Sequence, residues 1–317
     1  MRKKITLDEQ VIPWILGQED SFVKYIKSKI NVNISARSSN IYLEGDENEV
    51  LFVEKLLKHL SAIASKRRIS IDDVKDVFNM LQNSKGSNVE DVFLDRIRVA
   101  GWTKEVFLKT KNQYNYVNAI RNNDVVFCIG PAGTGKTYLA MALAINMFLE
   151  KKISRIILTR PAVEAGESLG FLPGDIAAKI DPYLRPLYDA LFEMLDAEKA
   201  NRLIEKGVIE LAPLAYMRGR TLNDSFIVLD EAQNTTIRQL KMFLTRLGFN
   251  SKAVINGDVT QVDLPANKNS GLILAQDILR DIKDIKFIYF DKSDVVRNPI
   301  VQRIIEAFDE YEREATS

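Results

Sequence analysis

One eight-residue segment has the residue types and the spacing of a phosphate-binding loop. GPAGTGKT at 130–137 fits the pattern G-x-x-x-x-G-K-[ST], follows an apolar run and precedes apolar residues at helical spacing. Glycines in such a loop allow backbone N–H groups to face a phosphate chain, and the following helix N-terminus adds partial positive charge. We therefore expect Lys136 to contact the β- and γ-phosphates of ATP and Thr137 to bind Mg²⁺. The residues expected to bind the nucleotide are Gly130, Pro131, Ala132, Gly133, Thr134, Gly135, Lys136, Thr137 and Tyr138.

Two adjacent carboxylates follow another apolar run. The segment FIVLDE at 226–231 ends in Asp230 and Glu231. At the end of a buried strand, Asp230 would hold Mg²⁺ and Glu231 would polarise an attacking water as a general base. An acidic strand end that only precedes a helix cap is the alternative. Beside a phosphate loop, the pair favours hydrolysis over transfer to an organic hydroxyl.

Two further segments could contact a nucleotide. VINGDVTQ at 254–261 ends an apolar run in polar residues, where the carboxyl edge of a parallel sheet binds ligands. Gln261 could report the state of the γ-phosphate there, and a turn without a role is the alternative. Upstream, the amide of Gln113 could pair with an adenine edge and Tyr114 could stack on the base. From the residues alone, a solvated helix start is the favoured interpretation of Gln113.

Apolar runs without polar alternation indicate strands that are buried on both faces, as in parallel sheets. Helical patterns separate these runs, so 109–317 is predicted to be an α/β domain with helices on both faces of a parallel sheet. Residues 1–83 show a helical pattern, a hairpin and two more helical patterns, the last with Ser70 as N-cap, which is typical of a small α+β domain. Residues 84–108 are expected to connect the two domains. The apolar runs are 125–129, 156–159, 226–230, 253–256 and 287–290.

The composition excludes several classes of protein. Lys and Arg number 44 and Asp and Glu number 43, so any nucleic-acid contact must come from local patches of charge. A single cysteine, Cys128, excludes an internal disulfide and a cysteine-rich zinc site, and a single histidine, His59, nearly excludes a histidine-based triad or a multi-histidine metal site. No apolar run reaches the ~20 residues of a membrane span, and no signal peptide is evident. We expect a cytoplasmic protein without membrane contact.

Five longer segments resemble the PhoH-like family of P-loop ATPases, and the agreement spans about residues 109–308. That family's core is similar to the first motor domain of superfamily-one helicases, a RecA-like fold. The resemblance implies that Gln113 recognises adenine and that Asp258 and Gln261 couple the γ-phosphate to movement. It also implies that the loop at 166–174 and the helix around 182–195 face RNA or a partner, with a plain insertion loop as the alternative. The segments are LTRPAVEAGESLGFLPGD at 158–175, KIDPYLRPLYDAL at 179–191, MRGRTLNDSFIVLDEAQN at 217–234, NGDVTQVDLP at 256–265 and SDVVRNPIVQ at 293–302.

The N-terminal domain resembles a KH-like RNA-binding fold in its order of helix, hairpin and helix and in the spacing around Gly17. A KH domain clamps the nucleotide backbone with G-x-x-G. Here Asp20 replaces the second glycine and follows Glu19, and these carboxylates would repel phosphates. Nearby lysines could bind RNA instead, and a packing or docking domain is the alternative. The lysines are Lys24, Lys27 and Lys29.

An arginine that neutralises the transferred phosphoryl group is the remaining expected part, since such a finger typically adds ~10³–10⁵ in rate. Two-domain helicases supply it from a second motor domain, for which this chain is too short. We therefore expect it from a neighbouring subunit in a ring or another homo-oligomer. Arg297 is the catalytic candidate, with Arg246 beside it. The weaker candidates are Arg160, Arg218 and Arg220.

These residues favour an enzyme that hydrolyses ATP in RNA metabolism, as an RNA-remodelling or helicase-like motor that could assist a ribonuclease. The alternative is a slow nucleotide-dependent scaffold that docks an RNA-processing partner. A small-molecule kinase is a distant third, because Glu231 and the GDVTQ segment at 257–261 are atypical of one.

Overall fold

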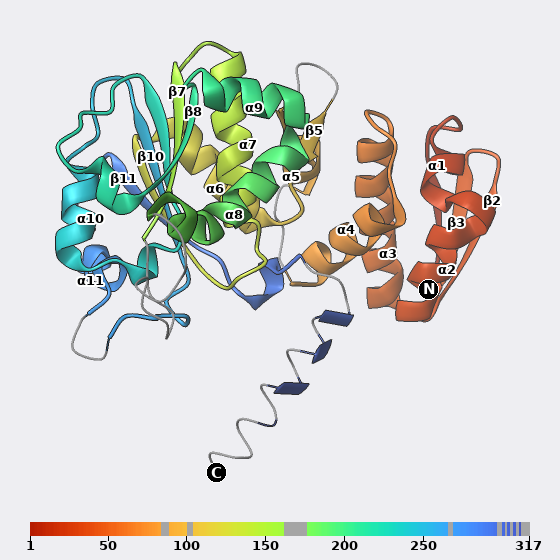
Figure 1. The fold of residues 1–317 in the computed structure, drawn as a ribbon. Coiled ribbons are helices and arrows are strands. Elements are labelled where there is room, and N and C mark those ends of the chain that lie inside the picture. The colour runs from red at the N-terminus through yellow and green to blue at the C-terminus, as the bar shows by residue number, and fades with distance from the viewer. Residues whose placement is uncertain are drawn as a thin grey trace. The chain divides into compact units, whose positions relative to one another are not determined.

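The computed structural model describes two compact units, which consist of residues 1–96 with 107–114 and of 97–106 with 115–317 (Figure 1). The loop expected at 166–174 and Arg297 lie outside the described residues. The described residues are 1–83, 89–99, 104–161, 176–265 and 269–296, with Ile300, Val301, Arg303, Ile304, Ala307, Phe308 and Tyr311.

The first unit packs helices against one face of an antiparallel sheet with the strand order β1-β3-β2. Side chains alternate along each strand, so Ile34, Ile41 and Leu43 are buried while Tyr42 is exposed. The expected hairpin and helices are confirmed, and β1 is an additional edge strand. The elements are β1 (Arg2–Thr6), α1 (Ile12–Leu16), η1 (Gln18–Asp20), α2 (Ser21–Lys29), β2 (Val32–Arg37), β3 (Asn40–Gly45), α3 (Glu47–Ala64), α4 (Ile71–Asn83) and α5 (Val89–Leu94).

The polar caps of this unit follow the sequence signals. Ser70 accepts a hydrogen bond from the Asp73 N–H (3.2 Å), which confirms it as the cap of α4. Asp73 in turn accepts from the Ser70 N–H (2.7 Å) and from Arg67 (2.7 Å). The loop before α2 is unusual because Glu19 and Asp20 both have positive φ, 52° and 57°. Such a backbone suits glycine better than an acidic side chain. The KH-like assignment stays a prediction.

The second unit is built on a parallel sheet with the strand order β11-β6-β10-β9-β7-β8 (Figure 1). One face, which includes Phe127, Ile227 and Ile255, forms a core with α10 and α11, and α7 packs on β7, β9 and β10. The predicted α/β class with helices on both faces is confirmed. The strands are β6 (Val125–Ile129), β7 (Arg155–Arg160), β8 (Ile209–Pro213), β9 (Ser225–Leu229), β10 (Lys252–Gly257) and β11 (Ile285–Tyr289). The helices are α7 (Lys136–Leu149), α8 (Ile176–Met194), α9 (Ala197–Glu205), α10 (Ile237–Leu244) and α11 (Gly271–Ile278), with η3 (Leu214–Met217), η4 (Ala232–Asn234) and η5 (Lys292–Asp294).

Strand β8 is a correction to the sequence analysis, which found five runs in this sheet. It pairs with β7 alone at the sheet edge, and Glu210 interrupts its apolar residues. An edge strand is half-covered and need not be continuously apolar. A search for continuous apolar runs, the signal of strands buried on both faces, therefore did not identify β8.

Residues 84–108, which were expected to connect the domains, carry ordered elements of their own. Helix α5 packs against α3 in the first unit. Two short strands, β4 (Arg96–Arg98) and β5 (Glu105–Phe107), form a separate small sheet. Helix α6 (Lys111–Asn122) follows and leads into β6. No helix among the described residues is both long and apolar enough to cross a membrane.

Asp76 in α4 gives the first unit a pH-dependent stability. Burial raises the pKa of its carboxyl to about 6, and Lys109 opposes that rise. Because this pKa lies above the ordinary value of 3.8, the ionised carboxylate costs folding free energy. This cost in folding free energy is absent at a pH below the pKa that Asp76 has in the unfolded chain. It is complete once the pH has risen above the pKa that Asp76 has in the folded protein.

We therefore expect Asp76→Asn to raise the free energy of unfolding by about 1 kcal/mol at pH 7.5, after allowance for solvent screening. The gain should shrink at pH 5, where the wild-type carboxyl is largely protonated in the folded state. Urea unfolding at the two pH values measures both gains. Asp91→Asn, at an exposed carboxylate on α5 of the same unit, is the matched control. Equal gains at both pH values would contradict the assignment.

Candidate active site

The segment 130–137 turns between the end of β6 and the start of α7, as the sequence predicts. Gly133 and Gly135 have φ of 82° and 84°, a backbone region that residues with a Cβ rarely adopt. Gly135 directly precedes the first residue of α7. The loop therefore places the N-terminus of a 14-residue helix at the carboxyl edge of the sheet, where the helix end favours anions.

Lys136 is buried, and its ammonium group bends back onto the loop. Its Nζ donates to the carbonyl oxygens of Gly130 (2.6 Å) and Pro131 (2.8 Å). Burial lowers the pKa of Lys136, and nearby acidic groups oppose the shift. Among the described residues, no carboxylate lies within ion-pair distance of this ammonium group. A buried cation held by neutral carbonyls is a fitting partner for an added phosphate.

Thr137 and Asp230 supply adjacent oxygens for a divalent cation. The Thr137 hydroxyl donates to Asp230 Oδ1 at 2.5 Å, although the two residues belong to α7 and to the end of β9. Mg²⁺ commonly takes one or two protein oxygens and completes its shell with phosphates and water. The Thr137 hydroxyl and the Asp230 carboxylate fit this coordination of Mg²⁺. The described residues contain no cluster of three or more His, Cys, Asp or Glu that would form an alternative metal site.

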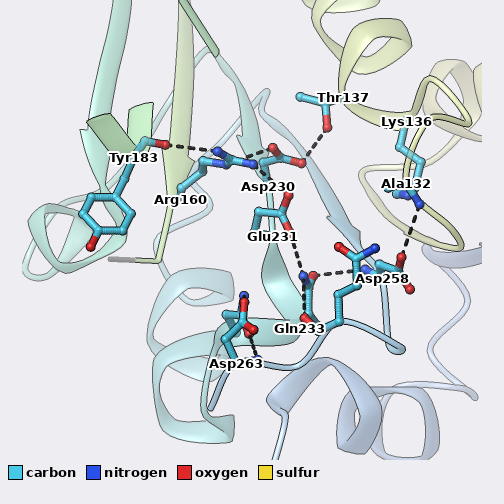
Figure 2. Close-up of polar contacts among 12 residues, drawn as sticks. Ala132, Lys136, Thr137, Arg160, Tyr183, Asp230, Glu231, Gln233, Asp258 and Asp263 are labelled. Atoms are coloured by element: carbon cyan, nitrogen blue, oxygen red, sulfur yellow. Dashed lines mark hydrogen bonds and ion pairs between the residues drawn. The ribbon is translucent and has the colours of Figure 1, made fainter. Parts of the chain in front are cut away.

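Arg160 joins the two carboxylates to helix α8 (Figure 2). Its Nε lies 3.0 Å from Asp230 Oδ2, in an ion pair without hydrogen-bond geometry, and its Nη2 donates to Glu231 Oε1 at 2.7 Å. Its Nη1 donates to the carbonyl of Tyr183 at 3.1 Å. Burial raises the pKa of Asp230, and the Arg160 guanidinium is the largest influence against that rise.

Gln233 is a functional candidate that the sequence analysis missed. Its side chain is 1% exposed, and its Nε2 donates to Glu231 Oε2 (2.6 Å) and to the Gln261 carbonyl (3.1 Å). Its Oε1 accepts from the Asp258 N–H at 3.0 Å. One amide thus links the expected general base to the loop after β10 (Figure 2). The sequence feature that could have identified Gln233 is its position, two residues after Glu231 within the family-like segment 217–234.

Asp258 connects that loop to the phosphate loop. Its Oδ2 accepts from the Ala132 N–H at 3.2 Å, and its Oδ1 accepts from the Thr260 N–H at 3.0 Å. Gln261 follows, and its backbone N–H donates to the Asp258 carbonyl. The ends of β6, β9 and β10 are therefore tied together by side chains as well as by the sheet.

A cavity of about 320 Å³ opens among these residues, a size within the range of small-molecule sites. It brings together most of the residues that the sequence predicted for catalysis and metal binding, and Arg160 as well. Its charged and polar lining consists of Lys136, Thr137, Tyr138, Arg160, Asp230, Glu231, Asp258 and Gln261.

Four other predicted residues are not part of the lining of this cavity. Gln113 belongs to the first unit, where it is buried and its Oε1 accepts from the Lys109 N–H (2.8 Å) at the start of α6. Arg246 donates to the carbonyls of Met242 and Arg220. Arg220 forms a two-bond ion pair with Glu210 (2.6 and 2.7 Å), and Arg218 is exposed. None of these four residues lines the cavity.

The fold and the site define a P-loop NTPase-like protein, a class whose sites bind a nucleotide and Mg²⁺. The chain belongs to the PhoH-like family, because a family profile described as "PhoH-like protein" matches residues 105–309. Together the fold, site and family support a nucleotide-dependent activity.

Several relatives extend this similarity over most of the chain. A "PhoH-like protein" of Bacillus subtilis (strain 168) is 49% identical over 98% of this chain and 97% of that protein. One from Synechocystis is 46% identical over 94% of this chain and 91% of its own length. "Protein PhoH" of Escherichia coli (strain K12) is 44% identical over 65% of this chain and 59% of that protein. Among solved structures, a Sulfolobus solfataricus SWI2/SNF2 ATPase core aligns with a TM-score of 0.37 at 14% identity, over 57% of this chain and 43% of that chain.

Lys136→Ala should weaken binding of a Mg²⁺-bound, non-hydrolysable ATP analogue by about 10- to 100-fold, because charged hydrogen bonds of this kind contribute about 1.5–3 kcal/mol. Isothermal titration calorimetry measures the change. Lys152→Ala, at an exposed lysine paired with Glu150, is the matched control and should bind like wild type. Equal affinity of the two variants for the analogue would contradict the assignment of Lys136 to nucleotide binding.

Proposed function

We propose that the protein hydrolyses ATP with Mg²⁺ and uses the reaction to remodel RNA, as a helicase-like motor that assists a ribonuclease. The observation that carries the hydrolytic part is the placement of Glu231. Its carboxylate lines the same cavity as Lys136 and Asp230, and Gln233 links it to the loop after β10. A carboxylate in this place is suited to accept a proton from water.

The residues would divide the reaction as follows. Lys136 exchanges the loop carbonyls for the β- and γ-phosphates, and the backbone of 130–137 holds the phosphate chain. Thr137 and Asp230 would bind Mg²⁺, which neutralises charge on the phosphate oxygens when it is present. Glu231 orients the attacking water and takes its proton. Gln261, which also lines the cavity, would contact the γ-phosphate.

Features of the first unit support the RNA part of the proposal. Lys24, Lys27 and Lys29 are exposed on α2, the helix that follows the loop that a KH domain would use. Exposed lysines suit a phosphate backbone. Glu19 and Asp20 are exposed in that loop too, which favours contact through the lysines. In a homo-oligomer, an arginine from a neighbouring subunit would neutralise the transferred phosphoryl group, and Arg297 is the candidate.

One observation favours the scaffold as a second function. Both oxygens of the Glu231 carboxylate are engaged here, one by Arg160 and the other by Gln233. An attacking water would have to displace or share these partners, so slow turnover would suit a protein whose nucleotide state controls docking of an RNA-processing partner.

Glu231→Gln should lower kcat for ATP by about 10²–10⁴-fold, the usual range for a general base, while ATP binding persists. A phosphate-release assay with and without single-stranded and duplex RNA measures this and tests the motor. Glu205→Gln, at an exposed glutamate at the end of α9, is the control. Turnover in Glu231→Gln equal to wild type would sink the hydrolytic assignment. Wild-type turnover that RNA leaves unchanged would favour the scaffold.

Gln233→Met should lower kcat by about 10- to 100-fold and change KM for ATP little, because the amide that it removes orients Glu231 and makes no hydrogen bond to the phosphate loop itself. Steady-state kinetics over a range of ATP concentrations separates the two constants. Gln276→Met, at a half-buried glutamine that bonds to Tyr289, controls for loss of stability. A rise in KM at constant kcat would place Gln233 in nucleotide binding instead.

A further inference from the structure

Arg160 is held by three different groups at the carboxyl edge of the sheet. It ends β7, which pairs with β9, so it lies beside the residues that follow β9. Its side chain is 15% exposed, and its three nitrogens reach Asp230, Glu231 and the Tyr183 carbonyl (Figure 2). The first two partners belong to the nucleotide site and the third belongs to α8.

Charge balance makes this guanidinium a competitor of a divalent cation. The two oxygens of Asp230 are shared, Oδ1 with Thr137 and Oδ2 with Arg160. A cation at Thr137 and Asp230 would bring two positive charges next to the guanidinium and would draw on the same carboxylate. Two positive charges that share one carboxylate repel each other strongly where little water screens them. Binding of the cation and retention of the Arg160 contacts are therefore opposed.

The contact of Arg160 with the Tyr183 carbonyl determines which element would respond when Arg160 moves. Arg160 is fixed to α8 through a backbone carbonyl, so a shift of its side chain changes a bond to that helix. Pro186 and Ala190 of α8 line the cavity as well. A local exchange of charge partners is thus connected to a 19-residue helix.

We propose that Arg160 is a positioning residue that exchanges partners with nucleotide state. Without nucleotide it neutralises Asp230 and Glu231 and holds the Tyr183 carbonyl. When a divalent cation arrives with a nucleotide, Arg160 leaves the carboxylates, Glu231 becomes free to orient water, and α8 loses its contact. Helix α8 is then the element that reports site occupancy. The inference rests on the proposed function only in requiring that the site binds a metal-bound nucleotide.

Three variants of the full chain test this role. Arg160→Gln removes the charge, and Arg160→Lys keeps it without the planar fork that reaches three acceptors. Arg155→Gln, at the opposite end of the same strand, is the matched control. The ligand is Mn²⁺ with a non-hydrolysable ATP analogue. Electron paramagnetic resonance measures Mn²⁺ binding, and amide hydrogen exchange is followed over 183–194.

We expect Arg160→Gln to bind Mn²⁺ about tenfold more tightly at pH 8, a coupling of ordinary size between two sites. In wild type and Arg155→Gln, exchange over 183–194 should become faster when the analogue and Mn²⁺ bind. In Arg160→Gln it should be fast from the start and unresponsive, with Arg160→Lys between the two.

Other outcomes overturn the inference. If wild type binds the ligand but exchange over 183–194 is unchanged or slower, Arg160 is a fixed structural ion pair. If Arg160→Gln does not fold, the wild-type and Arg160→Lys measurements decide in the same way. If wild type binds neither Mn²⁺ nor the analogue, the proposed function itself fails, and this inference fails with it.

Discussion

Asp230 carries its carboxyl group at the buried end of β9, and burial of a carboxylate is unfavourable unless cations and donors neutralise it. Its partners come from separate elements, Thr137 from α7 and Arg160 from β7, while the neighbouring Glu231 carboxylate raises its pKa further. The raised pKa of Asp230 reflects a site whose cations do not fully offset burial. A site balanced in this way gains from an added divalent cation, and the phosphates that accompany it would offset the buried charge of Lys136.

The parallel sheet makes this meeting of charges possible. Strands β6, β10, β9 and β7 are neighbours, and because they are parallel their carboxyl ends meet at one edge. Each strand contributes one part: the phosphate loop, Asp258, the Asp230 and Glu231 pair, and Arg160. The left-handed φ of 54° at Glu231 turns the chain sharply after β9. Strained backbone of this kind is common where side chains must be aimed at a ligand.

Much of this site follows from sequence, because a phosphate loop and a strand-end carboxylate are local patterns. Lys136, Thr137 and Asp230 come together as the motifs imply, and buried strands are recognisable when they are continuously apolar. Gln233 was not singled out, and the ion pairs of Arg160, which was considered as a weaker finger candidate, were not predicted, since contacts between the ends of different strands depend on strand order. Strand β8 was missed because Glu210 interrupts it. Gln113 is a buried residue at a helix start, whereas the residues alone favoured a solvated one, and the adenine contact that the resemblance implies stays a prediction.

The central claim is that the 130–137 loop and Lys136 receive the phosphates of a nucleotide. A crystal structure with Mg²⁺ and a non-hydrolysable ATP analogue tests it most directly. The account predicts that Lys136 Nζ leaves the carbonyls of Gly130 and Pro131 and lies on the β- and γ-phosphates, with the metal ion at Thr137 and Asp230. Nucleotide bound elsewhere, with Lys136 still on those carbonyls, would contradict it.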